Sequence, residues 1–183
     1  FEKDNKKISK FLDKNKNSIV IVHNKYALRI LETDYKGREK LLRIGKANKK
    51  NISDKGNREQ DLLDVFIQSL KEISKNNKLI IVYPVPGMEY SAPRKILNQT
   101  RKGEEIPIIS SSYDYFKERN KIFFNSFDQI KNDNVFRVYP HKIFCDKQIK
   151  NKCVANNKNE LFYIDNNHLS LRGSELVVDE IFK

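Results

Sequence analysis

One short segment near the C-terminus combines the residue types that acid–base chemistry needs. Asp165 stands three residues before His168, between an apolar segment and a predicted helix. In a turn, this spacing lets a carboxylate hold Nδ1 of the imidazole and leaves Nε2 to act as a general base toward a hydroxyl. The same segment is also typical of an Asp- and Asn-rich helix start with Ser170 as the N-cap, so the spacing leaves both interpretations open.

A second candidate follows the first apolar run of the chain. Asn24 comes just after Ser18–Val22, where a side-chain amide could donate a hydrogen bond to a developing oxyanion. The chain contains 20 Asn residues, so a simple turn role for Asn24 remains the alternative. The neighbouring His23 has the same ambiguity.

The two cysteines, Cys145 and Cys153, are separated by seven residues within one predicted loop. A loop of this size can close as a disulfide, which would contribute roughly 2–3 kcal/mol through chain entropy. A disulfide would indicate an oxidising compartment, whereas two free thiols would fit a cytosolic protein. Neither a CxxC motif nor a Cys/His cluster is present, and no metal site is predicted.

The elements that must position these residues alternate along the chain. Apolar, β-branched runs predict strands at 18–22, 78–83 and 135–139, and amphipathic patterns predict helices at 1–14, 58–75, 113–131 and 171–182. The remaining stretches predict an exposed loop at 36–58, with one strand pair around 41–44, and an irregular segment at 87–112.

This alternation favours an α/β fold with a mostly parallel sheet and helices on both faces. The unbroken apolar runs further predict strands that are buried on both faces. Because parallel strands end at one edge, the fold should gather His23 and Asn24, the segment Pro84–Gly87 and the turn at 165–168 along that edge.

Length and composition restrict the class of protein. One domain is expected from 183 residues, of which 38% are hydrophobic, and no apolar run approaches the length of a membrane-spanning helix. The net charge is +12, with 27 Lys, 9 Arg and 24 acidic residues. Because Arg is scarce and Lys is spread along the whole chain, a solvated basic surface is favoured over nucleic-acid binding, with an anionic envelope surface as the other alternative. The first residue is Phe1, which predicts a processed product or a piece of a longer chain.

Several landmarks, taken in order, resemble a known family. They are the strand ending at Asn24–Tyr26, the strand leading into Val82–Pro86, the helix over 115–130, the Cys145 to Cys153 loop, and the segment Phe162–Gly173. Together they resemble the SGNH domain appended to the C-terminus of membrane-bound acyltransferases that O-acetylate bacterial surface polysaccharides. The resemblance covers nearly the whole chain, and its most specific part is the paired Cys followed by the aromatic-Ile-Asp-x-x-His-Leu-Ser-x-x-Gly segment.

The resemblance implies a three-layer α/β/α fold of the SGNH-hydrolase type and a Ser-His-Asp triad. In that triad His168 would be the base and Asp165 its orienting partner, and Asn24 lies near the place of the oxyanion Asn. The family's nucleophile belongs to a Gly-Asp-Ser motif after the first strand, and no Gly-Asp-Ser occurs in these 183 residues. We therefore expect residues 1–183 to form a single, N-terminally incomplete SGNH-like domain whose first strand and Ser lie outside this chain.

The resemblance also implies a function for the parent protein. It would transfer an acetyl or other short acyl group to a hydroxyl of a bacterial surface polysaccharide, at the periplasmic face of the inner membrane. Its partners would be a membrane acyltransferase domain in the same chain and the polysaccharide acceptor, with no nucleic acid. This domain would need no cofactor, since acetyl-CoA would act through the membrane domain, and this chain alone would be inactive. A non-catalytic glycan- or protein-binding module and a stand-alone carbohydrate esterase are the alternatives.

Overall fold

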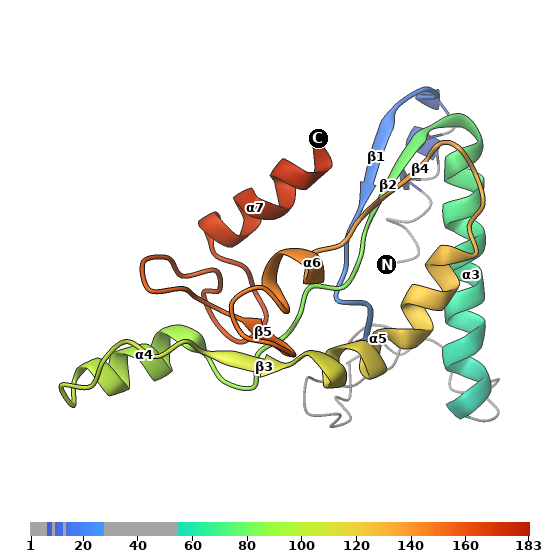
Figure 1. Ribbon diagram of the computed structural model, residues 1–183. Helices are drawn as coiled ribbons and strands as arrows, with labels where there is room; N and C mark the ends of the chain where they lie inside the picture. The colour runs from blue at the N-terminus through green and yellow to red at the C-terminus, as the bar shows by residue number, and fades with distance from the viewer. Residues whose placement is uncertain (1–6, 9, 13, 28–54) are drawn as a thin grey trace.

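The centre of the protein is a short parallel sheet. In this computed structural model, which describes residues 7, 8, 10–12, 14–27 and 55–183, three strands pair in the order β1-β2-β4. They are β1 (Ile19–Val22), β2 (Lys78–Val82) and β4 (Val135–Val138), and all run in parallel (Figure 1). A separate antiparallel pair joins β3 (Ser110–Ser112) to β5 (Lys152–Val154).

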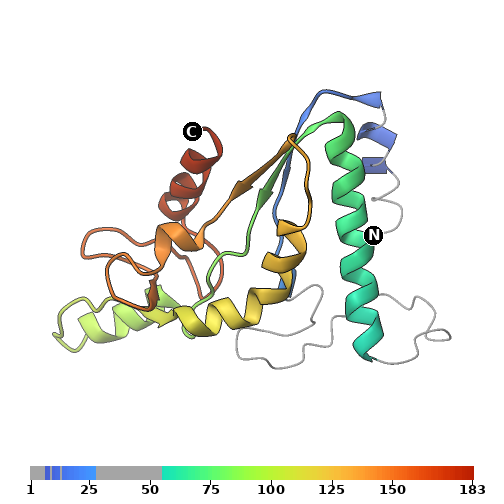
Figure 2. The same ribbon diagram turned by 45° about the vertical axis from the view of Figure 1, so that its right-hand side comes forward.

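Helices cover both faces of the parallel sheet. Helices α3 (Lys55–Asn76) and α5 (Tyr113–Asp128) lie on one side, and α7 (Leu171–Ile181) lies on the other, with the single turn α6 (His141–Phe144) beside it (Figures 1 and 2). Side chains alternate along β2, so that two buried clusters form on opposite faces of the sheet. The predicted three-layer α/β/α fold is thus confirmed.

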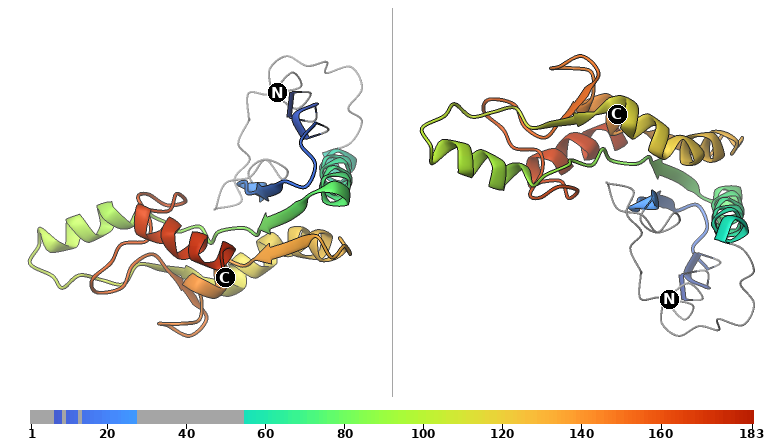
Figure 3. Two further views of the ribbon diagram at one scale, coloured as in Figure 1. Left: turned by 90° about the horizontal axis from the view of Figure 1, so that it is seen from above. Right: turned by 90° about the horizontal axis from the view of Figure 1, so that it is seen from below.

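Each cluster joins the sheet to the helices of its side. The first contains Leu79 and Ile81 of β2 together with Leu63 and Leu70 of α3 and Phe123 and Phe127 of α5. The second contains Ile80 and Val82 of β2 together with Val138, Phe144 and Val177. Seen along the vertical axis of Figure 1, α7 and α3 stand on opposite sides of the strands (Figure 3).

The expectation that β1 is buried on both faces was wrong. Val20 and Val22 pack against the first cluster, but the side chains of Ile19 and Ile21 are 62% and 49% exposed. β1 is also the end strand of the sheet, and among the described residues no strand pairs with its outer edge. An outer edge and an open apolar face therefore meet on the same strand.

The N-terminal helix also departs from its prediction. The described residues between positions 7 and 14 are helical, as expected, but Ile8 and Phe11 are 57% and 62% exposed, so the expected apolar face is not buried. Helix α3 begins at Lys55, three residues before the predicted start at 58. The loop at 36–54 and its predicted strand pair lie outside the described residues.

Two elements form within the stretch at 87–112 that was predicted to be irregular. Helix α4 (Ala92–Thr100) carries Pro93 in its first turn, where the missing N–H of proline would have no intrahelical partner in any case. Strand β3 consists of three serines, which have little intrinsic preference for a strand, and it depends on its pairing with β5.

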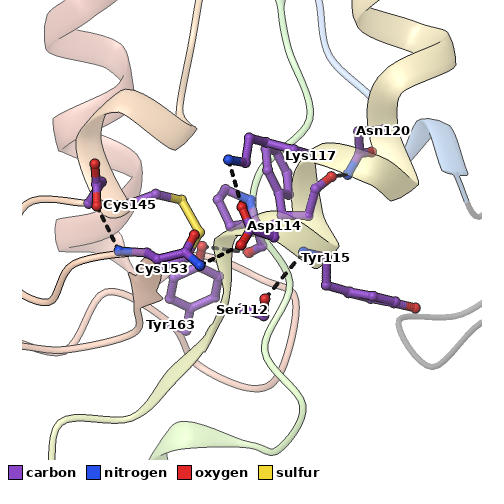
Figure 4. The surroundings of a disulfide bond; sticks show 12 residues. Ser112, Asp114, Tyr115, Lys117, Asn120, Cys145, Cys153 and Tyr163 are labelled. Atoms are coloured by element: carbon purple, nitrogen blue, oxygen red, sulfur yellow. Dashed lines mark hydrogen bonds and ion pairs between the residues drawn. A yellow bond between two sulfur atoms is a disulfide. The ribbon is translucent and has the colours of Figure 1, made fainter.

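A disulfide joins Cys145, just after α6, to Cys153 in β5, and both cysteines are buried (Figure 4). Within the loop that it closes, the Asn151 backbone N–H donates to Oδ1 of Asp146 at 2.7 Å. The Asn151 side chain donates in turn to Asp114, at the start of α5, whose carboxylate also pairs with Lys117 at 2.7 Å. The loop therefore ties α5 to the antiparallel pair.

The start of α7 is fixed by a cap and by one close approach. Ser170 accepts a hydrogen bond from the Gly173 N–H at 3.0 Å, which is the expected N-cap interaction. A Cβ atom at Gly173 would overlap the carbonyl of Phe162, so only glycine fits between α7 and the preceding segment. This approach sets the distance between the helix and the turn at 165–168.

The change Gly173→Ala should therefore destabilise the protein more than a glycine change in open space. We expect a loss of about 2–3 kcal/mol in the free energy of unfolding, because the backbone must move to admit the methyl group. The matched control is Gly103→Ala, where φ is +75° but nothing lies within 4 Å of the added atom, and strain alone should cost about 1 kcal/mol. Urea denaturation of both variants measures the difference, and an equal or smaller loss at Gly173 would contradict the packing argument.

Candidate active site

The side chains of Asp165 and His168 form a close pair. His168 Nδ1 lies 2.5 Å from Oδ2 of Asp165, and the side chains are 53% and 39% exposed, respectively. The other carboxylate oxygen, Oδ1, accepts the backbone N–H groups of Asn167 and His168, each at 2.7 Å. The carboxylate thus orders the turn and orients the ring at the same time.

Lys25 contacts the opposite side of the ring. Its ammonium nitrogen lies 2.6 Å from His168 Nε2 and donates to Oδ1 of Asn167 at 2.7 Å. Since an ammonium can only donate and a carboxylate can only accept, Nε2 must carry the lone pair and Nδ1 the proton. This is the tautomer that a general base requires.

The pKa of the Asp165 carboxyl group is lowered. Partial burial raises the pKa of Asp165, but hydrogen bonds from the Asn167 N–H, from the His168 ring and from the His168 N–H outweigh this effect. The pKa of Asp165 consequently lies below its ordinary value. The ionised carboxylate is the form that holds Nδ1, and its partners keep it ionised.

The turn is anchored to the loop that follows β2. The hydroxyl of Tyr163, which is fully buried, donates to the carbonyl of Pro86 at 2.7 Å. The Met88 N–H donates to the carbonyl of Asn166 at 2.7 Å, and the Ile164 N–H donates to that of His168 at 3.0 Å. These bonds bring the 165–168 turn to the edge where β2 ends, as predicted from the parallel sheet.

Tyr26 fixes the end of β1 at the same edge. Its buried hydroxyl donates to the carbonyl of Val82 at 3.0 Å, and burial raises its pKa. Asn24 lies in the turn between β1 and Tyr26, where its Oδ1 accepts the Lys25 N–H at 2.8 Å. Among the described residues no acceptor is bound to the Asn24 side-chain NH₂, which leaves a donor in the turn that carries Lys25.

His23 does not join the pair. Its ring packs edge-on against Tyr26 with centroids 6.4 Å apart, and burial lowers its pKa against a weaker opposite effect of a hydrogen bond to the Val82 backbone. In the part of the chain that the structure describes, the group bound to His168 Nε2 is Lys25, and no serine hydroxyl forms a hydrogen bond there. Ser112 caps α5 and Ser170 caps α7, so neither replaces a nucleophile.

The sequence analysis missed Lys25 and Asn167 as site residues. Lys25 directly follows Asn24 at the end of a predicted strand, and this position was the signal that could have identified it. Within the described ranges, no group of three His, Cys, Asp or Glu side chains could hold a metal ion, and no helix is long and apolar enough to cross a membrane.

The fold and the Asp165–His168 pair agree with the known proteins to which the chain is similar. The family model of the SGNH domain (fused to AT3 domains) matches residues 2–183, so the chain belongs to that family. Its fold is similar to the periplasmic domain of a lipopolysaccharide acetyltransferase of Salmonella ser. Paratyphi A, with a TM-score of 0.51 and 20% identity. The match covers 77% of this chain and 52% of that one, so the chain spans about half the length of that domain. No curated protein matches the chain.

The depressed pKa of Asp165 predicts how the turn responds to acid. A group whose pKa is lowered by folding stabilises the folded form above its unfolded pKa of about 3.9, and this contribution disappears as the pH falls through the folded pKa. The side-chain carboxyl carbon signal of Asp165, followed by NMR, should therefore titrate with a midpoint below the ordinary Asp value of about 3.9. Asp165→Asn should lack this transition, and a midpoint at or above the ordinary Asp value would contradict the assignment.

The contact of Lys25 with His168 predicts a difference in chemical reactivity. Diethyl pyrocarbonate acylates an accessible imidazole nitrogen, and Lys25 lies against Nε2. We expect carbethoxylation of His168 to be several-fold faster in Lys25→Met, as measured by peptide mass spectrometry near neutral pH. Lys78→Met, at the opposite end of the sheet, is the matched control. Equal rates in the two variants would show that Lys25 does not shield the ring.

Proposed function

We propose that this chain is the C-terminal part of an O-acyltransferase that moves an acetyl or other short acyl group to a hydroxyl of a bacterial surface polysaccharide. The observation that carries the proposal is the Asp165–His168 pair, at the carboxyl edge of a parallel sheet in a chain of the SGNH family. The nucleophilic Ser is proposed to lie outside residues 1–183, so that this chain is inactive alone.

The geometry of the pair supports a two-step transfer. In the first step Nε2 of His168 takes the proton of the Ser hydroxyl while its oxygen attacks the acyl carbonyl, and Asp165 stabilises the imidazolium. The donor leaves with that proton and an acyl-serine remains. In the second step the sugar hydroxyl gives its proton to Nε2 and attacks the ester, which restores the Ser. The NH₂ group of Asn24 is proposed to stabilise the oxyanion in both steps.

The structure of β1 supports the proposed place of the missing Ser. Its outer edge is unpaired among the described residues, and Ile19 and Ile21 are exposed on one face of the strand beside that edge. Such an edge is a template for a further strand. A parallel strand added there would end near Asn24 and His168, which is where a nucleophile is required. Extending the reading frame upstream tests this point: a Gly-Asp-Ser after an apolar strand is expected, and an in-frame start near Phe1 would contradict it.

The proposed location and partners have separate support. Members of this family are fused to AT3 domains, which supports a membrane acyltransferase domain as the partner in the parent chain. The fold relative is a periplasmic domain, and the Cys145–Cys153 disulfide suits an oxidising compartment such as the periplasm. Acetyl-CoA, acting through the membrane domain, is the proposed acyl donor, and the SGNH domain itself is proposed to need no cofactor.

Acyl transfer by the full-length protein tests the roles of the site residues. His168→Ala should lower the rate about 10³-fold or more, and Asn24→Ala roughly 10²–10³-fold if its amide serves the oxyanion. Glu180→Ala, on the exposed side of α7, is the control and should retain the rate. The assay follows both the acylated polysaccharide and free acetate.

Three outcomes separate the proposal from its alternatives. Unchanged transfer by His168→Ala would overturn the catalytic proposal and favour a binding module. Release of acetate from acetylated sugar without any transfer would favour an esterase. Loss of transfer by His168→Ala together with retained transfer by Asn24→Ala would keep the base and remove Asn24 from the oxyanion site.

A further inference from the structure

A hollow beside the catalytic turn is lined by side chains suited to a sugar and to an anion. It has a volume of about 540 Å³ and is lined by Glu89, Tyr90, Ser91, Arg94, Lys95 and Asn98. These residues belong to the loop after β2 and to the first two turns of α4. Figure 1 shows α4 leaving that loop on the side of the sheet where the strands end.

The hollow is joined directly to the proposed catalytic turn. Met88, two residues before Tyr90, donates its N–H to the carbonyl of Asn166 at 2.7 Å. Two residues of chain span at most about 7 Å, so the backbone at Tyr90 lies close to the turn that holds His168. An oligosaccharide seated in the hollow would therefore lie near the turn that holds His168.

The polar groups of the hollow match the groups of a sugar ring. The Tyr90 side chain is 51% exposed, and aromatic faces of this kind pack against the C–H face of a pyranose. The side chains of Ser91 and Asn98 offer a hydroxyl and an amide, which can both donate and accept hydrogen bonds.

Two cations in the hollow, Arg94 and Lys95, form no ion pair with a carboxylate of the described residues. Both residues are exposed, and Lys95 lies over the Tyr90 ring with its nitrogen 5.3 Å from the centroid. Glu89 lines the same hollow. By contrast, Lys117 and Arg172 both pair with carboxylates on their own surfaces. A guanidinium beside an ammonium is a suitable site for a carboxylate or a phosphate.

From this arrangement we propose that the hollow binds an acidic sugar unit of the acceptor, through Arg94 and Lys95, and so directs a neighbouring hydroxyl toward His168. The ligand class is a pyranoside that carries a carboxylate or a phosphate. This inference rests on the proposed acyl transfer for the role of the bound sugar, but the binding itself requires no catalysis. The proposal also assigns a specific ligand to Arg94 and Lys95, two of the many cations on the surface.

Equilibrium binding to the chain tests the proposal at about 0.15 M ionic strength. The probes are trigalacturonate, the neutral galactotriose, glucose 6-phosphate and inorganic phosphate. We expect trigalacturonate to bind at least about tenfold more tightly than galactotriose, and we expect the double variant Arg94→Gln/Lys95→Gln to remove this advantage. The phosphate probes show whether the site prefers a carboxylate or a phosphate.

The same helix offers a matched control. Arg101→Gln/Lys102→Gln removes two exposed positive charges at the other end of α4, outside the hollow, and should leave all affinities unchanged. If this control lost as much affinity for trigalacturonate as Arg94→Gln/Lys95→Gln, the effect would come from the general positive charge of the surface, and the proposal would be overturned. Equal affinities for the charged and neutral trisaccharides, or no saturable binding at millimolar concentrations, would also overturn it. If inorganic phosphate binds as tightly as glucose 6-phosphate, the hollow holds a simple anion and the sugar part is wrong.

One further variant keeps this inference distinct from the proposed function. His168→Ala should bind trigalacturonate as the unchanged chain does, because His168 does not line the hollow. Retained binding together with unchanged transfer in the full-length His168→Ala protein would leave the acidic-sugar site standing and remove the catalytic proposal. Equal affinities of the unchanged chain for trigalacturonate and galactotriose, together with a His168-dependent transfer in the full-length protein, would remove the acidic-sugar site and leave the catalytic proposal standing.

Discussion

The Asp165 carboxylate is the group on which the arrangement of the site depends. One oxygen accepts two backbone N–H groups and closes the turn, and the other holds Nδ1 of His168. Turn geometry, ring orientation and tautomer therefore follow from a single side chain. Because those same hydrogen bonds keep Asp165 ionised, the group that orders the turn is also the one that would stabilise a protonated imidazole.

Residues next to Asp165 connect its turn to the rest of the fold. Tyr163 is fully buried and binds the loop after β2, and Gly173 allows α7 to approach the backbone of Phe162. The turn is thus held between a strand end and a helix start. Rigid support of this kind matters because a general base must be positioned to within a fraction of an ångström. Lys25 adds a cation at Nε2, so a hydroxyl that approaches His168 must displace an ammonium.

The positive charge and the exposed apolar side chains of this protein become informative only through their positions in the fold. The net charge of +12 is spread over the whole sequence and identifies no partner by itself. Two of the cations, Arg94 and Lys95, gain a specific interpretation because they line one hollow with Tyr90, and the loop before it is bonded to the 165–168 turn through Met88. Ile19 and Ile21 are exposed on one face of β1, and β1 is the end strand of the sheet in the part of the chain that the structure describes.

The sequence alone determined the fold class, the order of the main strands and helices, and the candidate pair Asp165 and His168. It could do so because alternation of apolar runs and an i, i+3 spacing are local features. It did not predict α4, since Pro93 is favourable only once it occupies a first helical turn, nor β3, which depends on pairing with β5. Lys25 lies 143 residues from His168, and the exposure of β1 depends on which strands pair with it. Contacts between distant segments are set by packing, and only the tertiary structure decides them.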